Sequence, residues 1–447
     1  MPFEPNYQVV QSIRDQVVEQ RRHRERLPAG LMELPDEELS RALADSAVSK
    51  MADEAVAAGG TLLTGEQMTA LVEAVMAEMY GLGRLQRLLD NEQIENIDAN
   101  GCDNVWVTYA SGEMKKEAPI AASDEDLIHA IQLIAHRKGH AERQFDFAHP
   151  ELDIRLPDGS RLSAVMAVSH RPLLSIRRHR LAAPTLDDLV GLGMLDARLS
   201  QLLYALVRTQ RNIMVAGEMN AGKTTLLRAL AACVAPHERI VTVEQSFELG
   251  LHEDIDAHPN AAALEAREAN MEGEGAVSMR RLVRRTKRMN ANRVIVGEVL
   301  GDEVIDMLTA MLQGRSGSMC TIHSESAYGT FSQVANYAIQ SPEHLGIDQA
   351  LALAAQALNF VVYVSLVDET EHTVQSGLTD GDFTARRYTR MVSEVIEIVG
   401  YDAGQVQANS IYAPDATGRP GFTGVPLSQP TLARLERAGF HPGGLMS

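Results

Sequence analysis

The stretch that decides the fold lies at residues 217–224 and reads Gly217-Glu218-Met219-Asn220-Ala221-Gly222-Lys223-Thr224. It matches the GxxxxGK(S/T) pattern of a P-loop at every defined position. The apolar run at 212–216 predicts a buried strand before the loop, and residues 225–234 predict a helix after it. At such a junction glycines let backbone amides face an anion, and the helix N-terminus adds partial positive charge. The sequence therefore predicts a cradle for nucleotide phosphates.

Two side chains of this loop have specific expected roles. Lys223 should reach the β- and γ-phosphates, and Thr224 should place its hydroxyl on Mg²⁺. The predicted cofactors are therefore ATP and Mg²⁺. A chain of this length should match the pattern by accident on the order of one or two times per hundred. The strand before the loop and the helix after it make an accident rarer still. The predicted cradle comprises Gly217, Glu218, Met219, Asn220, Ala221, Gly222, Lys223, Thr224 and Thr225.

Candidate acidic partners of the loop follow two other apolar runs. A P-loop needs a second strand end to hold Mg²⁺ and a group to orient water. Residues 293–298 end in Glu298, and residues 243–248 carry Glu248 just after a strand. The carboxyl ends of parallel strands form the ligand-binding edge of an open sheet. Either residue alone is most simply an ordinary surface glutamate, but beside a P-loop we favour a functional role for both.

A third candidate side chain is His323, which ends the segment 314–323. This segment begins with glycines and continues as an apolar run, so it predicts another strand of the same sheet. A single histidine is more often structural or solvated. At the end of such a strand, however, His323 is a candidate sensor of the γ-phosphate.

The pattern of predicted elements divides the chain into four parts. We expect a helical segment at 1–60, an α+β N-domain at 61–180, a linker at 181–185 and an α/β domain at 186–447. The last part alternates strands and helices, which is typical of a parallel sheet covered on both faces. Its tail from Pro414 is rich in Gly and Pro, and we expect it to be irregular.

Composition limits the function further. The chain has 447 residues, 60 of them Asp or Glu and 41 Lys or Arg, with a formal net charge of −19. Such an acidic chain is a poor candidate for sequence-independent nucleic-acid binding. Cys102, Cys233 and Cys320 form no CxxC pair, which argues against a disulfide framework or a zinc module. No run of about 18 apolar residues appears, so we expect a cytoplasmic protein that meets a membrane only through partners.

A local basic run stands out against this acidic background. Arg281, Arg284, Arg285 and Arg288 recur at the spacing of one helix face, with Arg280 and Lys287 beside them. A solvated face is the simplest interpretation. A contact with phosphate or with an acidic neighbouring subunit is the alternative.

Several further segments carry recognisable motifs. They are Leu156-Pro157-Asp158-Gly159-Ser160-Arg161, Ser175-Ile176-Arg177-Arg178, and residues 244–249, 270–275, 293–303 and 314–323. With the P-loop, these segments resemble the ATPases of type II and type IV secretion machines, most closely the ATPase of Tad/Flp pilus assembly, over roughly residues 85–424. The resemblance implies a RecA-like P-loop NTPase C-terminal domain joined to the α+β N-domain, with ATP between them, in a hexameric ring. It also implies a partner on the cytoplasmic face of an inner-membrane platform.

The resemblance also implies roles for individual residues. Lys223 and Thr224 would bind phosphate and Mg²⁺, Glu248 would activate water, and Glu298 would be the Mg²⁺-linked Walker B acid. Arg161 and Arg177 would be N-domain arginines that reach the nucleotide, where a planar guanidinium suits phosphoryl charge. Without the resemblance, ordinary surface pairing would be the preferred interpretation of both arginines.

Three positions depart from the family pattern. Gln245, Leu300 and Arg315 stand where Asp, Arg and His are usual, and each is expected to change a polar group near the site. These departures leave two hypotheses open. One is an ATP-hydrolysing motor with slowed turnover, and the other is a nucleotide-binding assembly scaffold that hydrolyses weakly or not at all. A DNA-translocating ATPase is disfavoured by the charge, and no direct nucleic-acid partner is expected.

Overall fold

The computed structural model describes residues 5–32, 34–59, 62–80, 82–110, 112–137, 144–156, 159–178, 183–267, 269, 273–368 and 388–440. The described residues up to 178 form one compact unit, and those from 183 form a second. Of the predicted linker, residues 181 and 182 lie outside the described residues, as do 157, 158 and 270–272 of the family-like segments. Among the described residues, no helix combines the length and the apolar character that crossing a bilayer requires.

The first unit begins with a small helical bundle. Helices α1 (Tyr7–Arg22), α3 (Asp36–Ala57) and α4 (Gly65–Tyr80) pack around one apolar core. Val10, Ile13 and Val17 recur every three or four residues, which puts all three on the buried side of α1. Helix α1 ends at Arg22, and a 3₁₀ turn, Arg24–Arg26 (η1), and the short helix α2 (Ala29–Met32) follow it. Helix α4 belongs to this bundle, although the predicted boundary at residue 60 assigns it to the N-domain.

A six-stranded antiparallel sheet completes the first unit. Its strand order is β3-β2-β1-β6-β5-β4. Helices α5 (Arg84–Asp90) and α6 (Asp124–Arg137) contribute to its core, and the alternating burial of β4, β5 and β6 leaves the other face exposed. The strands are β1 (Ile94–Asn100), β2 (Val105–Tyr109), β3 (Met114–Glu117), β4 (Glu151–Arg155), β5 (Arg161–Val165) and β6 (Leu173–Arg177).

The second unit is built on a nine-stranded sheet of order β15-β14-β13-β12-β7-β11-β10-β8-β9. The strands from β12 to β9 in this order are parallel, and β13, β14 and β15 add an antiparallel extension. The strands are β7 (Ile213–Gly217), β8 (Ile240–Glu244), β9 (Ala261–Glu265), β10 (Arg293–Val299), β11 (Met319–His323), β12 (Phe360–Asp368), β13 (Tyr388–Asp402), β14 (Gln405–Pro414) and β15 (Pro420–Phe422).

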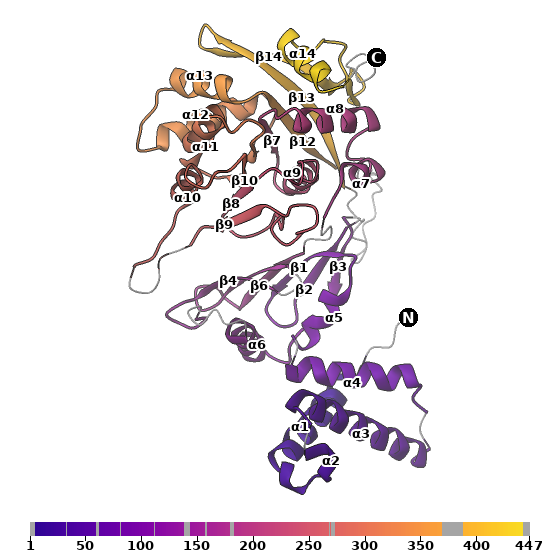
Figure 1. Cartoon of the computed structure of the whole chain (residues 1–447). Helices are drawn as coiled ribbons and strands as arrows, with labels where there is room; N and C mark the ends of the chain where they lie inside the picture. Colours follow the sequence, from indigo (N-terminus) through magenta and orange to yellow (C-terminus); the bar gives the residue numbers. More distant parts are fainter. Residues whose placement is uncertain are drawn as a thin grey trace, which may run out of the picture. The chain divides into compact units, whose positions relative to one another are not determined.

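Helices cover both faces of this sheet, which explains why strands such as β7 and β8 are buried at every residue (Figure 1). One face carries α7 (Leu186–Gly191), α8 (Ala197–Arg208), α9 (Lys223–Ala232) and α14 (Gln429–Arg437). The other carries α10 (Met279–Thr286), α11 (Glu303–Leu312), α12 (Gly329–Gln340) and α13 (Ile347–Ala357). The predicted α/β class is therefore confirmed. The prediction of an irregular tail after Pro414 is wrong, because β15 pairs with β14 and α14 packs Leu435 into the core.

The basic run lies on α10 and at its C-terminal end. Arg280 is buried and forms ion pairs with Asp302, Asp306 and Glu343. Arg284 pairs with Asp306 and Glu343 as well. Acidic groups of the same chain therefore neutralise the inner side of the run. Its outer side is exposed and lines a surface groove of about 820 Å³. The exposed arginines of this groove are Arg281, Arg284, Arg285 and Arg288, of which Arg284 also takes part in the ion pairs above.

Candidate active site

The P-loop joins β7 to α9, as the sequence predicts. Gly217 is the last residue of β7, and a Cβ at this position would lie 2.3 Å from the carbonyl oxygen of Val364 on β12. Gly222 caps α9 with φ +96°, a left-handed conformation that favours glycine. Thr224 and Thr225 follow in the first turn of the helix. The close approach of β12 and the left-handed cap explain why both defined glycines of the motif are needed here.

Lys223 is buried, with only 7% of its surface exposed. Its Nζ donates hydrogen bonds to the carbonyl oxygens of Gly217 at 3.2 Å and Glu218 at 2.8 Å. The same Nζ lies 3.0 Å from Nδ1 of His323. The loop therefore holds the ammonium group inside the cradle, at the point where the helix N-terminus presents its amides. Met219 and Asn220 lie at the exposed tip of the loop.

His323 connects the P-loop to the predicted Walker B acid. It ends β11, which lies between β7 and β10, and its Cα is the register partner of Gly217. Its Nε2 lies 2.8 Å from Oε1 of Glu298 on β10. A lysine ammonium can only donate, so Nδ1 of this ring accepts from Lys223, and Nε2 is the ring nitrogen that faces Glu298. Lys223, His323 and Glu298 thus form one row of polar contacts across three neighbouring strand ends.

The fourth strand end in the row is β8, and the buried residue there is Glu244. One carboxylate oxygen accepts the amides of Glu248 at 2.7 Å and Leu249 at 2.8 Å, and the other accepts the hydroxyl of Thr242 at 2.9 Å. Burial raises the pKa of Glu244, although these three hydrogen bonds favour its ionised form. Gly297 of β10 lies against its side chain, where a Cβ would stand 3.1 Å from Cγ of Glu244.

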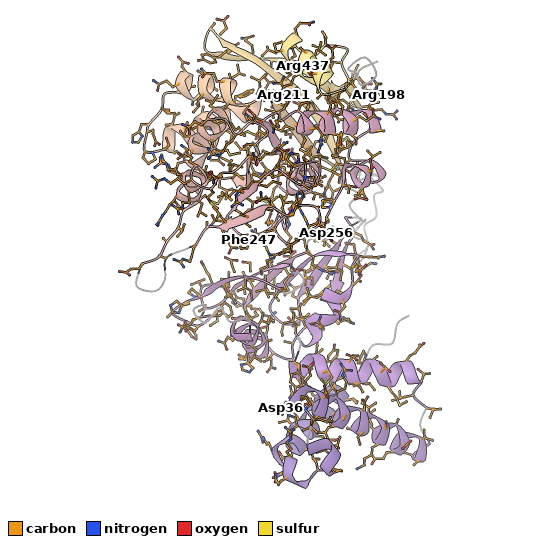
Figure 2. All side chains as sticks on the ribbon, in the orientation of Figure 1. Asp36, Arg198, Arg211, Phe247, Asp256 and Arg437 are labelled. Carbon is orange, nitrogen blue, oxygen red and sulfur yellow. The ribbon has the colours of Figure 1, made fainter. Side chains whose placement is uncertain are left out.

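Glu244 therefore fixes the loop that carries Glu248, whereas Glu248 itself is only half-buried. Phe247 lies in the same loop (Figure 2), and its amide donates to Glu265 of β9. Sequence reasoning selected Glu248 and missed the structural role of Glu244. The signal was present, because a carboxylate that ends a fully apolar strand must either be bonded or shift its pKa.

The two predicted N-domain arginines lie in the first unit, next to one another. Arg161 of β5 is the register partner of Arg177 of β6 and also of Arg155 of β4. The flanking Leu162 and Ile176 are buried, so the three arginines share the opposite face of the sheet. Arg155 is a member of this row that sequence reasoning missed. The alternation of the 151–155 and 161–165 hairpin strands would have placed it there.

The three departures from the family pattern do not lie in the same place. Gln245 and Leu300 follow the carboxyl ends of β8 and β10, and both are exposed. Arg315 precedes β11, at the opposite edge of the sheet from His323, and donates to the carbonyl oxygen of Thr286 at the end of α10. The expectation that Arg315 changes a polar group near the site is therefore wrong. Strand β11 lies between Arg315, which precedes its first residue, and His323, which is its last.

These residues fit a nucleotide with Mg²⁺. A buried ammonium, a glycine cradle that a Cβ would fill and a helix N-terminus suit phosphate oxygens. The hydroxyl of Thr224 and the carboxylate of Glu298 are the hard oxygen donors that Mg²⁺ prefers. The arrangement can therefore bind a polyphosphate, hold a divalent ion and orient water.

Comparisons with known proteins give a consistent family. The sequence matches the family described as "Type II/IV secretion system protein" over residues 78–409. A Mycobacterium tuberculosis (strain H37Rv) protein, provisionally named a conjugal transfer protein, is 34% identical over 274 residues, covering 59% of this chain and 75% of that protein. The type IV secretion system protein VirB11 of Brucella suis is 27% identical over 374 residues, covering 78% of this chain and 96% of that protein.

A solved structure of the VirB11 ATPase from the Brucella suis type IV secretion system, in complex with sulphate, is also similar. It is 25% identical and covers 63% of this chain and 90% of its own, with a TM-score of 0.33. The family match spans well over half of the chain, from the first unit into the second. The chain therefore belongs to the type II/IV secretion system protein family.

Proposed function

We propose that this chain hydrolyses ATP·Mg as the motor of a secretion or pilus-assembly machine, of the Tad/Flp type. The observation that carries the proposal is the row of polar contacts from Lys223 through His323 to Glu298. It links the phosphate-binding lysine, through one histidine, to the acid expected to hold Mg²⁺. An ordinary surface glutamate after a strand has no reason to share a histidine partner with a P-loop lysine.

Each residue has a defined part in this proposal. Lys223 would exchange its carbonyl acceptors, Gly217 and Glu218, for phosphate oxygens. Thr224 and Glu298 would hold Mg²⁺, which stabilises charge on the phosphoryl group when bound. His323 keeps the carboxylate of Glu298 oriented while Lys223 engages the phosphates. Glu248, fixed through its amide by Glu244, would orient the attacking water.

The arginine row of the first unit supports a further part of the proposal. Arg155, Arg161 and Arg177 stand in register on three adjacent strands. Guanidinium groups that share one face suit an anion such as a nucleotide phosphate, so Arg161 and Arg177 would complete the site when they reach the nucleotide. The chain would then convert binding into motion, because a closed state would bind nucleotide better than an open one.

The assembly in which this happens is proposed from the family. We place the chain in a homo-oligomer, as a hexameric ring, at the cytoplasmic face of an inner-membrane platform protein. Membrane association would be peripheral and through that partner.

One specific observation favours a second candidate, a nucleotide-dependent scaffold. Gln245 and Leu300 lie at the carboxyl edge of the sheet, where a missing polar group would slow hydrolysis. The two functions separate in one experiment on the full chain. Molecular size is measured with and without a non-hydrolysable ATP analogue, and phosphate release is measured with Mg²⁺ and with chelator. The motor predicts assembly and Mg²⁺-dependent release, both lost in Lys223→Ala. Assembly without phosphate release supports the scaffold. If neither assembly nor release is observed, both nucleotide-dependent functions are contradicted.

A further inference from the structure

An arginine from outside the P-loop holds the tip of the loop in place. Nε of Arg390 donates a hydrogen bond to the carbonyl oxygen of Asn220, at 2.9 Å. The two residues are 170 positions apart in the sequence. Neither the P-loop pattern nor the acidic motifs point to Arg390, so the site described above does not account for this contact.

The topology of the sheet explains how Arg390 reaches the loop. Strand β12 runs parallel to β7, with Val364 opposite Gly217, and β13 runs antiparallel to β12, with Arg390 opposite Leu366. The first residues of β13 therefore lie at the same edge of the sheet as the P-loop. Arg390 is two residues from Val392, which is buried in the core on the α9 side of the sheet. Its side chain thus lies on the side from which α9 begins.

The backbone of the loop tip needs such a restraint. Asn220 has φ +61°, a left-handed conformation that is unfavourable for any residue with a Cβ, although asparagine tolerates it better than most. Asn220 and Met219 are exposed, and 69% of the surface of Met219 is accessible. The tip therefore has little packing of its own. A charge-assisted hydrogen bond to the carbonyl of Asn220 stabilises this conformation directly.

A second contact surrounds Gly222, the helix cap. A Cβ on Gly222 would lie 3.3 Å from the methyl carbon of Met194 and 3.6 Å from Cδ of Arg390. Met194 is itself tied to the same strand, because its carbonyl oxygen accepts the amide of Val392 at 2.7 Å. Met194 and Arg390 of β13 thus pack against the P-loop at Gly222, and they can lie this close because Gly222 has no side chain.

We infer that Arg390 is a positioning residue for nucleotide binding: it keeps Asn220 in the left-handed conformation that shapes the cradle. The inference rests on the proposed nucleotide-binding function. The apparent dissociation constant for a nucleotide equals the intrinsic constant divided by the fraction of loops in the competent conformation. Loss of the restraint lowers this fraction in the free protein. A bound nucleotide restores it, so turnover at saturation changes little.

The test compares Arg390→Gln with the wild-type chain. Equilibrium binding of a fluorescent ADP analogue and of ATP·Mg is measured, together with kcat and KM for phosphate release. We expect affinity for both nucleotides to fall roughly tenfold, KM to rise in parallel, and kcat to stay within about twofold. The fall in affinity persists at high salt, because a lost hydrogen bond is not screened as a distant charge is.

The matched control is Arg198→Gln. Arg198 lies at the start of α8 in the same unit (Figure 2), and its guanidinium stacks on Phe422, 4.9 Å from the ring centre. The substitution of Arg198 removes the same charge as the substitution of Arg390. A second variant, Asn220→Val, places a β-branched side chain at φ +61° and should weaken binding by itself. Combining it with Arg390→Gln should add little, because both changes act on the same loop conformation.

Four results would overturn the inference. The first two are wild-type nucleotide affinity in Arg390→Gln and an equal loss of affinity in Arg198→Gln. The other two are a loss of affinity that disappears at high salt and full additivity of the losses in Arg390→Gln and Asn220→Val. A fall in kcat alone would show that Arg390 acts in the chemical step instead. If the wild-type chain binds no nucleotide at all, the proposed function fails and this inference falls with it.

Discussion

Nε2 of His323 lies 2.8 Å from Oε1 of Glu298, and this contact joins two strand ends of the parallel sheet. The other ring nitrogen of His323 lies 3.0 Å from the ammonium of Lys223. Because an ammonium group can only donate, Nδ1 accepts on that side, and the other ring nitrogen faces the carboxylate of Glu298. The His323 ring of β11 thus contacts both Lys223, which follows β7, and Glu298 of β10.

Substitution of His323 should expose this link. In His323→Ala the carboxylate of Glu298 loses its polar partner, and we expect kcat to fall roughly tenfold or more. His323→Gln, which keeps a polar group facing Glu298, should retain more turnover. His237→Ala changes an exposed histidine before β8 and serves as the control. Equal turnover of the Ala and Gln variants would argue against an orienting contact between residue 323 and Glu298.

Glu244 should give a measurable pH dependence of stability. Burial raises the pKa of its carboxyl, so ionisation in the folded state is unfavourable relative to the unfolded chain. The stability that this group contributes is complete below its unfolded pKa and declines as pH rises through the raised folded pKa. Glu244→Gln, which cannot ionise, should therefore gain in thermal midpoint relative to wild type between mildly acid and neutral pH. A constant difference across that range would contradict the sign.

Glu244→Ala should behave in the opposite way. It removes the acceptor of two amides, those of Glu248 and Leu249, and leaves the hydroxyl of Thr242 without this partner. We expect a loss of about 2–3 kcal/mol of unfolding free energy, together with slower turnover, because Glu248 is no longer fixed. Urea unfolding and phosphate release measured on the same preparation check both effects. Wild-type values in both would show that Glu244 does not hold this loop.

Substitution of the fully buried Arg293, which lies away from the candidate active site, should strongly reduce the free energy of unfolding. It pairs with Glu238 through two contacts of 2.8 Å and donates to the carbonyl oxygen of Gly317. Arg293→Ala leaves a carboxylate without its cation, and we expect a loss of about 3–5 kcal/mol of unfolding free energy. The double variant Arg293→Met with Glu238→Leu should recover most of it. A double variant as unstable as the single one would show that the ion pair itself supplies the stability.

The arginine row of the first unit predicts a kinetic effect. Arg161→Ala should lower turnover more than nucleotide affinity, because a guanidinium matches charge that develops on the phosphoryl group. Binding and steady-state kinetics on the full chain separate the two quantities. Arg171→Ala is a comparison in the same unit, since Arg171 pairs with Asp103 and Asp124 rather than belonging to the row. Equal losses of turnover and affinity in Arg161→Ala would count against a transition-state role.

Much of this fold follows from local pattern. Strands β7, β8, β10 and β11 are short apolar runs that end at Gly217, Glu244, Glu298 and His323 or just beyond, and parallel pairing brings these ends to one edge. The helix predicted over 225–234 corresponds to α9, Lys223–Ala232. The predicted strand ends and P-loop therefore needed no knowledge of long-range contacts.

The rest depends on contacts that no local pattern encodes. Strand β1 alternates weakly and is specified by its neighbours β2 and β6. Helix α14 follows a Gly- and Pro-rich stretch and forms because Leu435 packs into a distant core. Arg390 and Arg315 show the same limit: the first meets the P-loop from 170 residues away, and the second lies at the far edge of the sheet.

We expect Glu298 to act in the hydrolysis of ATP held by Lys223, and the turnover of the Glu298→Gln variant checks this role. Phosphate release at saturating ATP·Mg and equilibrium ATP binding are measured for this variant and for the wild-type chain. The proposed mechanism predicts ATP binding close to wild type and turnover lower by about 100-fold or more. Turnover within a few-fold of wild type, with ATP bound equally well, would contradict it.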